Sequence, residues 1–159
     1  MYSQLRRLPL FTMAVITLAI AFGGTAFAQA VGTWKLNLAK SKFQQGLAPK
    51  STTLKYEAAG QGIKVTVDSV PADGAPIHYA YTANYDGKDN PVAGNPDADT
   101  AARTRVDANT TKLVNKKGGK VMSTETIVTS PDGKMLTITT PGTNAKGQKV
   151  DGVAVYDKQ

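Results

Sequence analysis

Cysteine is absent from this chain of 159 residues, and histidine occurs once, at His78. The chain can therefore form no disulfide, no thiol nucleophile and no cysteine-ligated metal site. One histidine leaves too few partners for a catalytic triad or a metal cluster, and its place between Ile77 and Tyr79 predicts that it faces solvent. Carboxylate pairs, a nucleophile elbow and a phosphate-binding glycine loop are not recognisable either. We therefore expect no catalytic residue, no metal and no cofactor, and predict that the protein is not an enzyme.

Acidic residues are missing from the first 28 positions. Arg6 and Arg7 precede the apolar run LPLFTMAVITLAIAFGG, which is followed by Ala26-Phe27-Ala28. A basic start, an apolar centre and a small-x-small exit are typical of a secretory signal peptide. The alternative, a membrane anchor, needs about 20 apolar residues. We predict a signal peptide at 1–28, cleaved after Ala28, and one domain at 29–159. The protein would be exported, periplasmic or extracellular, with no membrane span after signal cleavage.

The remaining chain is modestly basic and poor in aromatic residues. Loss of Arg6 and Arg7 leaves 17 of the 19 basic residues against 12 acidic ones. This balance favours weak attraction to anionic surfaces, but without a basic helix or an aromatic–basic motif we expect no nucleic-acid partner. Beyond the leader only Phe43, Trp34 and five tyrosines are aromatic. That scarcity argues against a roomy pocket for a long acyl chain.

Period-two alternation dominates the domain, as in PIHYAYTANY, where Ile77, Tyr79, Tyr81, Ala83 and Tyr85 share one face. Turn signals of Gly, Asn, Asp and Pro separate such stretches. The pattern predicts an all-β fold, a single antiparallel up-and-down β-barrel of about 8–10 strands. A short helix is expected only within LAKSKFQQG. The expected strands are 31–38, 51–58, 61–70, 75–85, 100–107, 110–117, 120–129, 134–140 and 149–157.

Two hairpins bear on which residues face inward. A two-residue turn at Ala108-Asn109 would pair Thr104 with Leu113 on the inner face. It would leave a cationic outer face made of Arg103, Arg105, Lys112, Lys116, Lys117 and Lys120. At Gly118-Gly119 two registers stay open. With a bulge the inward residues are Val121, Ser123, Glu125 and Ile127, and without it they are Met122, Thr124, Thr126 and Val128.

The first and last expected strands carry a family resemblance. GTWKLNLAKSKF, which opens the domain, and the closing VAVYDK resemble the calycin superfamily of lipocalins and fatty-acid-binding proteins. With YDGKD and KKGGKV they make the domain similar to a group of uncharacterised, exported bacterial lipocalin-like β-barrel proteins. The resemblance implies that Gly32 and Trp34 form a structural plug at one end of the barrel. Tyr156 matches the tyrosine of the Arg-x-Tyr anion clamp of fatty-acid-binding proteins, but Ala154 replaces its arginine, so the clamp is not implied.

The resemblance implies a class of function but no particular ligand. It implies non-catalytic binding of a small, apolar or amphipathic ligand in the barrel interior, and the polar-tipped candidates are Tyr79, Tyr81, Glu125 and Tyr156. The alternative is a protein-binding module, for example of the protease- or lysozyme-inhibitor type, with a filled barrel. Its contact surface would be the loops at 86–100 and 116–120, and its partner would be another protein.

Overall fold

A computed structural model describes residues 30–142, 147, 149 and 151–159. The predicted signal peptide at 1–28 lies outside these residues, so it stays a prediction. Gly32 to Lys158 contribute eleven strands, and no helix is found between them in the described part of the chain. The strands are β1 (Gly32–Leu36), β2 (Lys42–Phe43), β3 (Ser51–Ala59), β4 (Gly62–Val70), β5 (Ile77–Asn84), β6 (Asp86–Pro91), β7 (Thr100–Arg105), β8 (Thr110–Lys117), β9 (Lys120–Thr129), β10 (Met135–Thr140) and β11 (Gly152–Lys158).

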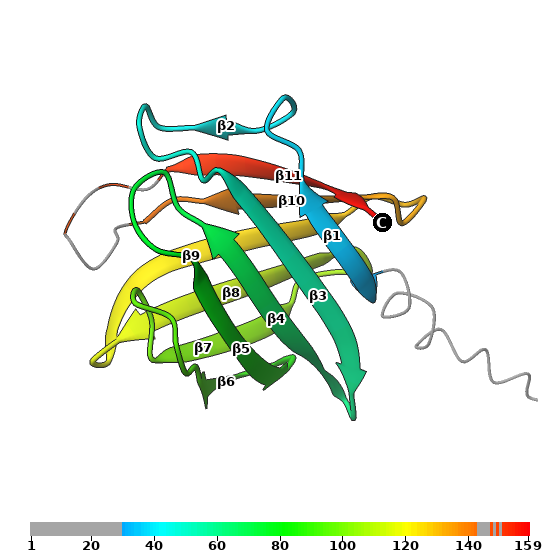
Figure 1. Ribbon diagram of the computed structural model, residues 1–159. Helices are drawn as coiled ribbons and strands as arrows, with labels where there is room; N and C mark the ends of the chain where they lie inside the picture. The colour runs from blue at the N-terminus through cyan, green and yellow to red at the C-terminus, as the bar shows by residue number, and fades with distance from the viewer. Residues whose placement is uncertain (1–29, 143–146, 148, 150) are drawn as a thin grey trace, which may run out of the picture.

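Ten of these strands wind into a nearly closed antiparallel barrel. Their order is β5-β4-β3-β1-β11-β10-β9-β8-β7-β6, and β2 pairs with the start of β11 off this path. In Figure 1, β1, β3, β4 and β5 cross in front of β7 to β11. The bridge between Ala80 and Ala93 joins β5 to the segment after β6 where the two ends of the sheet meet. The predicted all-β, up-and-down barrel is therefore confirmed.

The nine expected strands are all present, but two elements differ from the prediction. The segment expected as a short helix contains a turn and then β2, which pairs Phe43 with Gly152. The acidic stretch after Tyr85, expected as a loop, contains β6, which pairs with β7. β2 has only two residues, and β6 is polar and largely exposed, so neither shows the apolar alternation that marks a half-buried strand.

The predicted outer position of Arg103 is wrong. Arg105 pairs with Thr111 and Arg103 with Leu113, one residue away from the expected register. The connection is longer than a two-residue turn, because the Asp107 carboxylate accepts hydrogen bonds from the backbone N–H groups of Asn109 and Thr110. A slip of one residue moves every side chain of a strand to the other face. Arg103 is accordingly 2% exposed, inside the barrel. The predicted outer position of Arg105 is wrong for the same reason, because it shares the face of Arg103 and lies 5.1 Å from the ring centroid of Tyr85.

At the next hairpin Glu125 turns inward, as expected for the register with a bulge, but the strand pairs are shifted by two residues from that register. Leu113 pairs with Glu125 and Asn115 with Ser123. A bulge is present opposite Asn115 and Lys116, where Met122 is the extra residue of β9, so the faces of β9 change beyond Ser123. Val121, expected inside in that register, is therefore 52% exposed.

Candidate functional site

The barrel interior is packed at one end and hollow at the other. The hollow half is a cavity of about 340 Å³. Its wall is mainly apolar and aromatic, with a few polar groups among them, which is the usual composition of a small-molecule site. The lining residues are Phe43, Thr52, Leu54, Tyr56, Val65, Val67, Ser69, Ile77, Tyr79, Tyr81, Asn95, Asp97, Ala98, Leu113, Asn115, Met122, Ser123, Glu125, Ile127, Ile138, Thr140, Ala154 and Tyr156.

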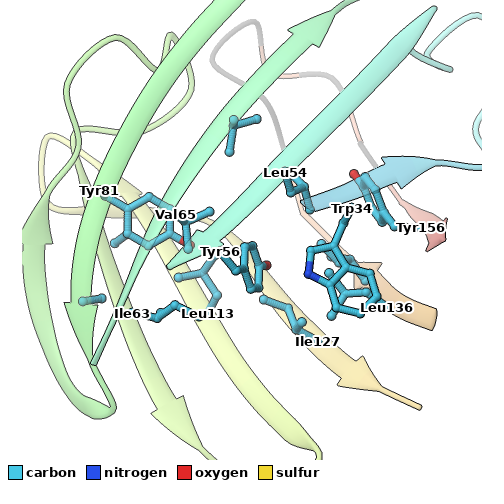
Figure 2. Packing of buried hydrophobic residues seen from close by; sticks show 14 of the residues in the cluster. Trp34, Leu54, Tyr56, Ile63, Val65, Tyr81, Leu113, Ile127, Leu136 and Tyr156 are labelled. Carbon is cyan, nitrogen blue, oxygen red and sulfur yellow. The ribbon is translucent and has the colours of Figure 1, made fainter. Parts of the chain in front are cut away.

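Trp34 and Leu136 fill the closed end, and neither side chain is exposed. Figure 2 shows them next to each other, with Tyr156 beside them. The Trp34 indole N–H donates to the carbonyl oxygen of Ala30 at 2.9 Å, and the Lys158 ammonium lies 5.1 Å from the ring centroid. A Cβ at Gly32 would lie 2.7 Å from Cε of Lys158, so the flexible end of this lysine would have to shift. Gly32 also has a φ of 140°, a backbone conformation that favours glycine.

All four residues predicted for the ligand site line the cavity. Tyr79 and Tyr81 come from β5, Glu125 from β9 and Tyr156 from β11. Burial raises the pKa of each of the three tyrosines above its ordinary value of 10.0. The hydroxyls therefore stay protonated at neutral pH and are available as neutral hydrogen-bond donors and acceptors. Their assignment as ligand-binding residues stays a prediction.

Glu125 of β9 is one of the two acidic residues that line this cavity. The Asn115 amide donates to its Oε1 at 2.8 Å and also to the Ser123 hydroxyl oxygen at 3.1 Å. Burial raises the pKa of Glu125 to about 6, against the opposing effects of the Arg103 charge and of the Asn115 and Ser123 hydrogen bonds. Burial thus outweighs the effects by which Arg103, Asn115 and Ser123 favour the ionised carboxylate.

Arg103 lies inside the barrel at the edge of the packed half, whereas the sequence predicts it on the outer face. Its guanidinium donates to the Thr111 hydroxyl at 3.2 and 3.3 Å and to the Tyr81 hydroxyl at 3.5 Å. It also lies 5.2 Å from the ring centroid of Tyr56 and 5.9 Å from that of Tyr85, within cation–π range. Asp107, which can begin a turn through its side chain, was the sequence signal for the longer connection that turns Arg103 inward.

The mouth of the cavity is formed by segments outside the regular barrel strands as well as by strand ends. Phe43 from β2 and Ile77 from the start of β5 are apolar, and Asn95 and Asp97 follow β6. The Asn95 side chain accepts a hydrogen bond from the backbone N–H of Asp97 at 2.9 Å. The connection after β6 is tied to the barrel by the bridge between Ala93 and Ala80 of β5 and by the hydrogen bond from the Asp99 N–H to the Lys116 carbonyl.

Elsewhere the titratable residues make surface contacts. His78 is exposed, and its Nδ1 lies 2.6 Å from a carboxylate oxygen of Asp68. Asp89 pairs with Lys116 at 2.8 Å, and Asp99 accepts the backbone N–H of Gly118 at 2.7 Å. Within the described ranges, no three His, Cys, Asp or Glu side chains gather as metal ligands would. Among those same residues, no helix has the length and hydropathy needed to cross a bilayer.

The comparisons with known proteins do not assign the chain to a family. No family model matches the chain, and no curated protein matches it. Among solved structures, a redesigned β-barrel, mFAP1, bound to DFHBI, is similar with a TM-score of 0.40 and 12% sequence identity. The match covers 84% of this chain and 98% of that one.

Proposed function

We propose that this protein is an exported, lipocalin-like barrel that binds a small, partly apolar molecule without catalysis. The observation that carries the proposal is the cavity of about 340 Å³ in the open half of the barrel. A barrel of this strand number can be filled by side chains or can hold one small ligand. Kinship with the calycin superfamily, proposed on the Gly32-x-Trp34 opening, agrees with this role.

The size of the cavity limits the ligand. At about 30 Å³ for each water in the liquid, the space equals about eleven waters. The volume is therefore that of a ligand of about ten non-hydrogen atoms. Apolar contact would come from residues such as Val67, Ile138 and Ala154, and orientation from the tyrosine hydroxyls and Glu125.

Native mass spectrometry of the protein purified from its own exported fraction tests the proposal. The expected result is a protein mass without residues 1–28 and with a small adduct that is lost on activation. Ala154→Phe places a ring in the cavity and should abolish the adduct. Thr139→Phe adds the same ring at an exposed position of the neighbouring β10 and should keep it.

Two results would contradict the proposal. One is a bare protein mass in the exported fraction, combined with no uptake of 1-octanol by the purified protein. The other is an adduct that survives Ala154→Phe in a folded protein. Either would favour the protein-binding alternative, with the connections at 86–100 and 116–120 as its contact surface. Recovery of the protein from the cytoplasm with residues 1–28 attached would contradict export.

A further inference from the structure

We infer that the cavity selects an amphipathic ligand with a protonated nitrogen, and that the Glu125 carboxylate is the counter-ion for this nitrogen. The inference rests on the proposed function and adds the chemical class of the ligand. It is carried by the distribution of charged groups in and under the cavity.

The charged side chains that line the cavity are acidic. Among the described residues these are Glu125 in the wall and Asp97 at the mouth, and no lysine or arginine is part of the lining. The chain as a whole is basic, with 19 Lys and Arg against 12 Asp and Glu. The charged groups on the cavity wall are thus opposite in sign to the net charge of the molecule, while Arg103, also inside the barrel, is not part of this wall. The wall should therefore favour cationic over anionic ligands.

Arg103, the charged neighbour beneath Glu125, is occupied by other partners. Its guanidinium contacts Thr111 and the Tyr81 hydroxyl and lies against the Tyr56 ring. In the described part of the chain, no lysine or arginine nitrogen pairs with the Glu125 carboxylate within 4.0 Å. The cation lowers the cost of ionising Glu125, but its N–H groups donate to Thr111 and Tyr81 and not to this carboxylate.

The direct partners of Glu125 hold it in place and leave it charged. Asn115 donates to one carboxylate oxygen at 2.8 Å, and the same amide nitrogen reaches Ser123 at 3.1 Å. An ionised carboxylate can accept several more hydrogen bonds. In a cavity with mainly apolar walls it interacts with a cation more strongly than it would in water. An ammonium group is the complementary occupant, whereas a fatty-acid carboxylate would be repelled.

The same geometry makes binding dependent on pH. The pKa of Glu125 is about 6, and burial keeps the neighbouring Tyr79, Tyr81 and Tyr156 protonated across neutral pH. A primary amine stays charged throughout this range, so protonation of Glu125 removes the attraction as the pH falls below 6. The ionisable groups around Glu125 are Tyr56 of β3, Tyr79 and Tyr81 of β5, Arg103 of β7 and Tyr156 of β11, with Asp97 at the mouth.

The experiment compares three probes with the same eight-carbon chain: octylamine, 1-octanol and octanoate. Affinities are measured by NMR titration of the full domain at pH 7.5 and at pH 5. At pH 7.5 we expect octylamine to bind at least tenfold more tightly than octanol, and octanoate to bind most weakly. At pH 5 the advantage of octylamine should fall roughly tenfold, because about nine-tenths of a carboxyl with a pKa near 6 is then protonated.

The two glutamates of the chain supply a matched pair of variants. Glu125→Gln should remove the preference for octylamine over octanol. Glu57→Gln deletes the same charge on the outer face, where Glu57 pairs with Lys55, and should leave the preference intact. If Glu125→Gln does not fold, the pH comparison on the unsubstituted domain decides, because it needs no variant.

The outcomes separate this inference from the proposed function. Octanoate binding most tightly, equal affinities for octylamine and octanol, or a preference that survives Glu125→Gln would overturn the inference. In each case a probe still occupies the cavity, so the proposed function stands. No shift of cavity-lining resonances by any of the three probes would overturn both.

Discussion

Trp34 has no exposed surface. Its indole N–H donates a hydrogen bond to the Ala30 carbonyl, which ties the segment before β1 to the packed end of the barrel. Trp34→Ala should lower the free energy of unfolding by about 3–5 kcal/mol, as expected for removal of a buried aromatic side chain. Trp34→Phe keeps most of the apolar contact and should cost less. Urea unfolding followed by circular dichroism measures both. A loss below about 1 kcal/mol for the alanine variant would show that the indole does not close the barrel.

Glu125 gives a stability prediction with a defined sign. Its pKa is about 6 in the folded protein against an ordinary value of 4.5. The folded state therefore holds the proton more tightly than the unfolded chain, and stability is lost as the pH rises from 4.5 through 6. The loss is roughly 2 kcal/mol above pH 6, at 1.36 kcal/mol for each pKa unit.

Glu125→Gln should accordingly stabilise the ligand-free domain by up to that amount at pH 8 and leave it unchanged at pH 4. Chemical unfolding of both proteins at the two pH values measures the difference, with Glu57→Gln as the control. A variant that is less stable than the parent at pH 8 would show that the ionised carboxylate stabilises the fold. Glu125 would then have a structural role that the proposed counter-ion role does not require.

Arg103 and Glu125 should be coupled electrostatically. The guanidinium lowers the pKa of Glu125 against the effect of burial. Arg103→Met, an unbranched apolar replacement, should therefore raise the pKa of Glu125 above 6. The carboxyl carbon shift of Glu125 followed by NMR from pH 4 to pH 9 reports this directly. An unchanged or lower pKa of Glu125 would mean that the Arg103 guanidinium does not stabilise the ionised carboxylate.

At the scale of elements, the β3–β4 hairpin contains two glycines with different requirements. Gly60 has a φ of 58° and open space around it, so Gly60→Ala should cost about 1–2 kcal/mol for the left-handed backbone. At Gly62 a Cβ would lie 2.3 Å from the backbone oxygen of Ala83 in β5. Gly62→Ala should cost more than Gly60→Ala, because β4 and β5 would have to move apart. Thermal unfolding of the two variants gives the comparison, and an equal loss would contradict the close approach.

The strands could be predicted from the sequence, and the residues that face the cavity only in part. Alternation marks β3, β4 and β5 clearly, so Tyr79 and Tyr81 were predicted inside the barrel, where they lie. Register depends on turn geometry, and the hydrogen bonds of Asp107 lengthen one turn enough to reverse the faces of β7. Arg103 was missed for that reason. The inward face of a strand is predicted from its apolar residues, so a buried arginine is predicted on the wrong face.

At the scale of the whole molecule, the distribution of large side chains divides the barrel into a packed and a hollow half. Trp34, Leu136 and Arg103 occupy the closed end, whereas the residues nearer the mouth include Thr52, Ser69 and Ala154. Small side chains are compatible with a narrow, filled barrel as well as with a cavity, so composition alone could not distinguish the two. Whether a cavity forms depends on which inward side chains face each other from opposite sides of the closed barrel. The sequence of a single strand does not contain this information.

The occupancy of that hollow half is the central claim, and methyl-resolved NMR with octylamine tests it most directly. The account predicts intermolecular nuclear Overhauser effects between the octyl chain and the methyl groups of Val67, Ile138 and Ala154, all of which line the cavity. It predicts none to the exposed methyl groups of Leu38 and Val106. Contacts with the exposed methyl groups alone, or none with the cavity methyl groups at saturating probe, would contradict it.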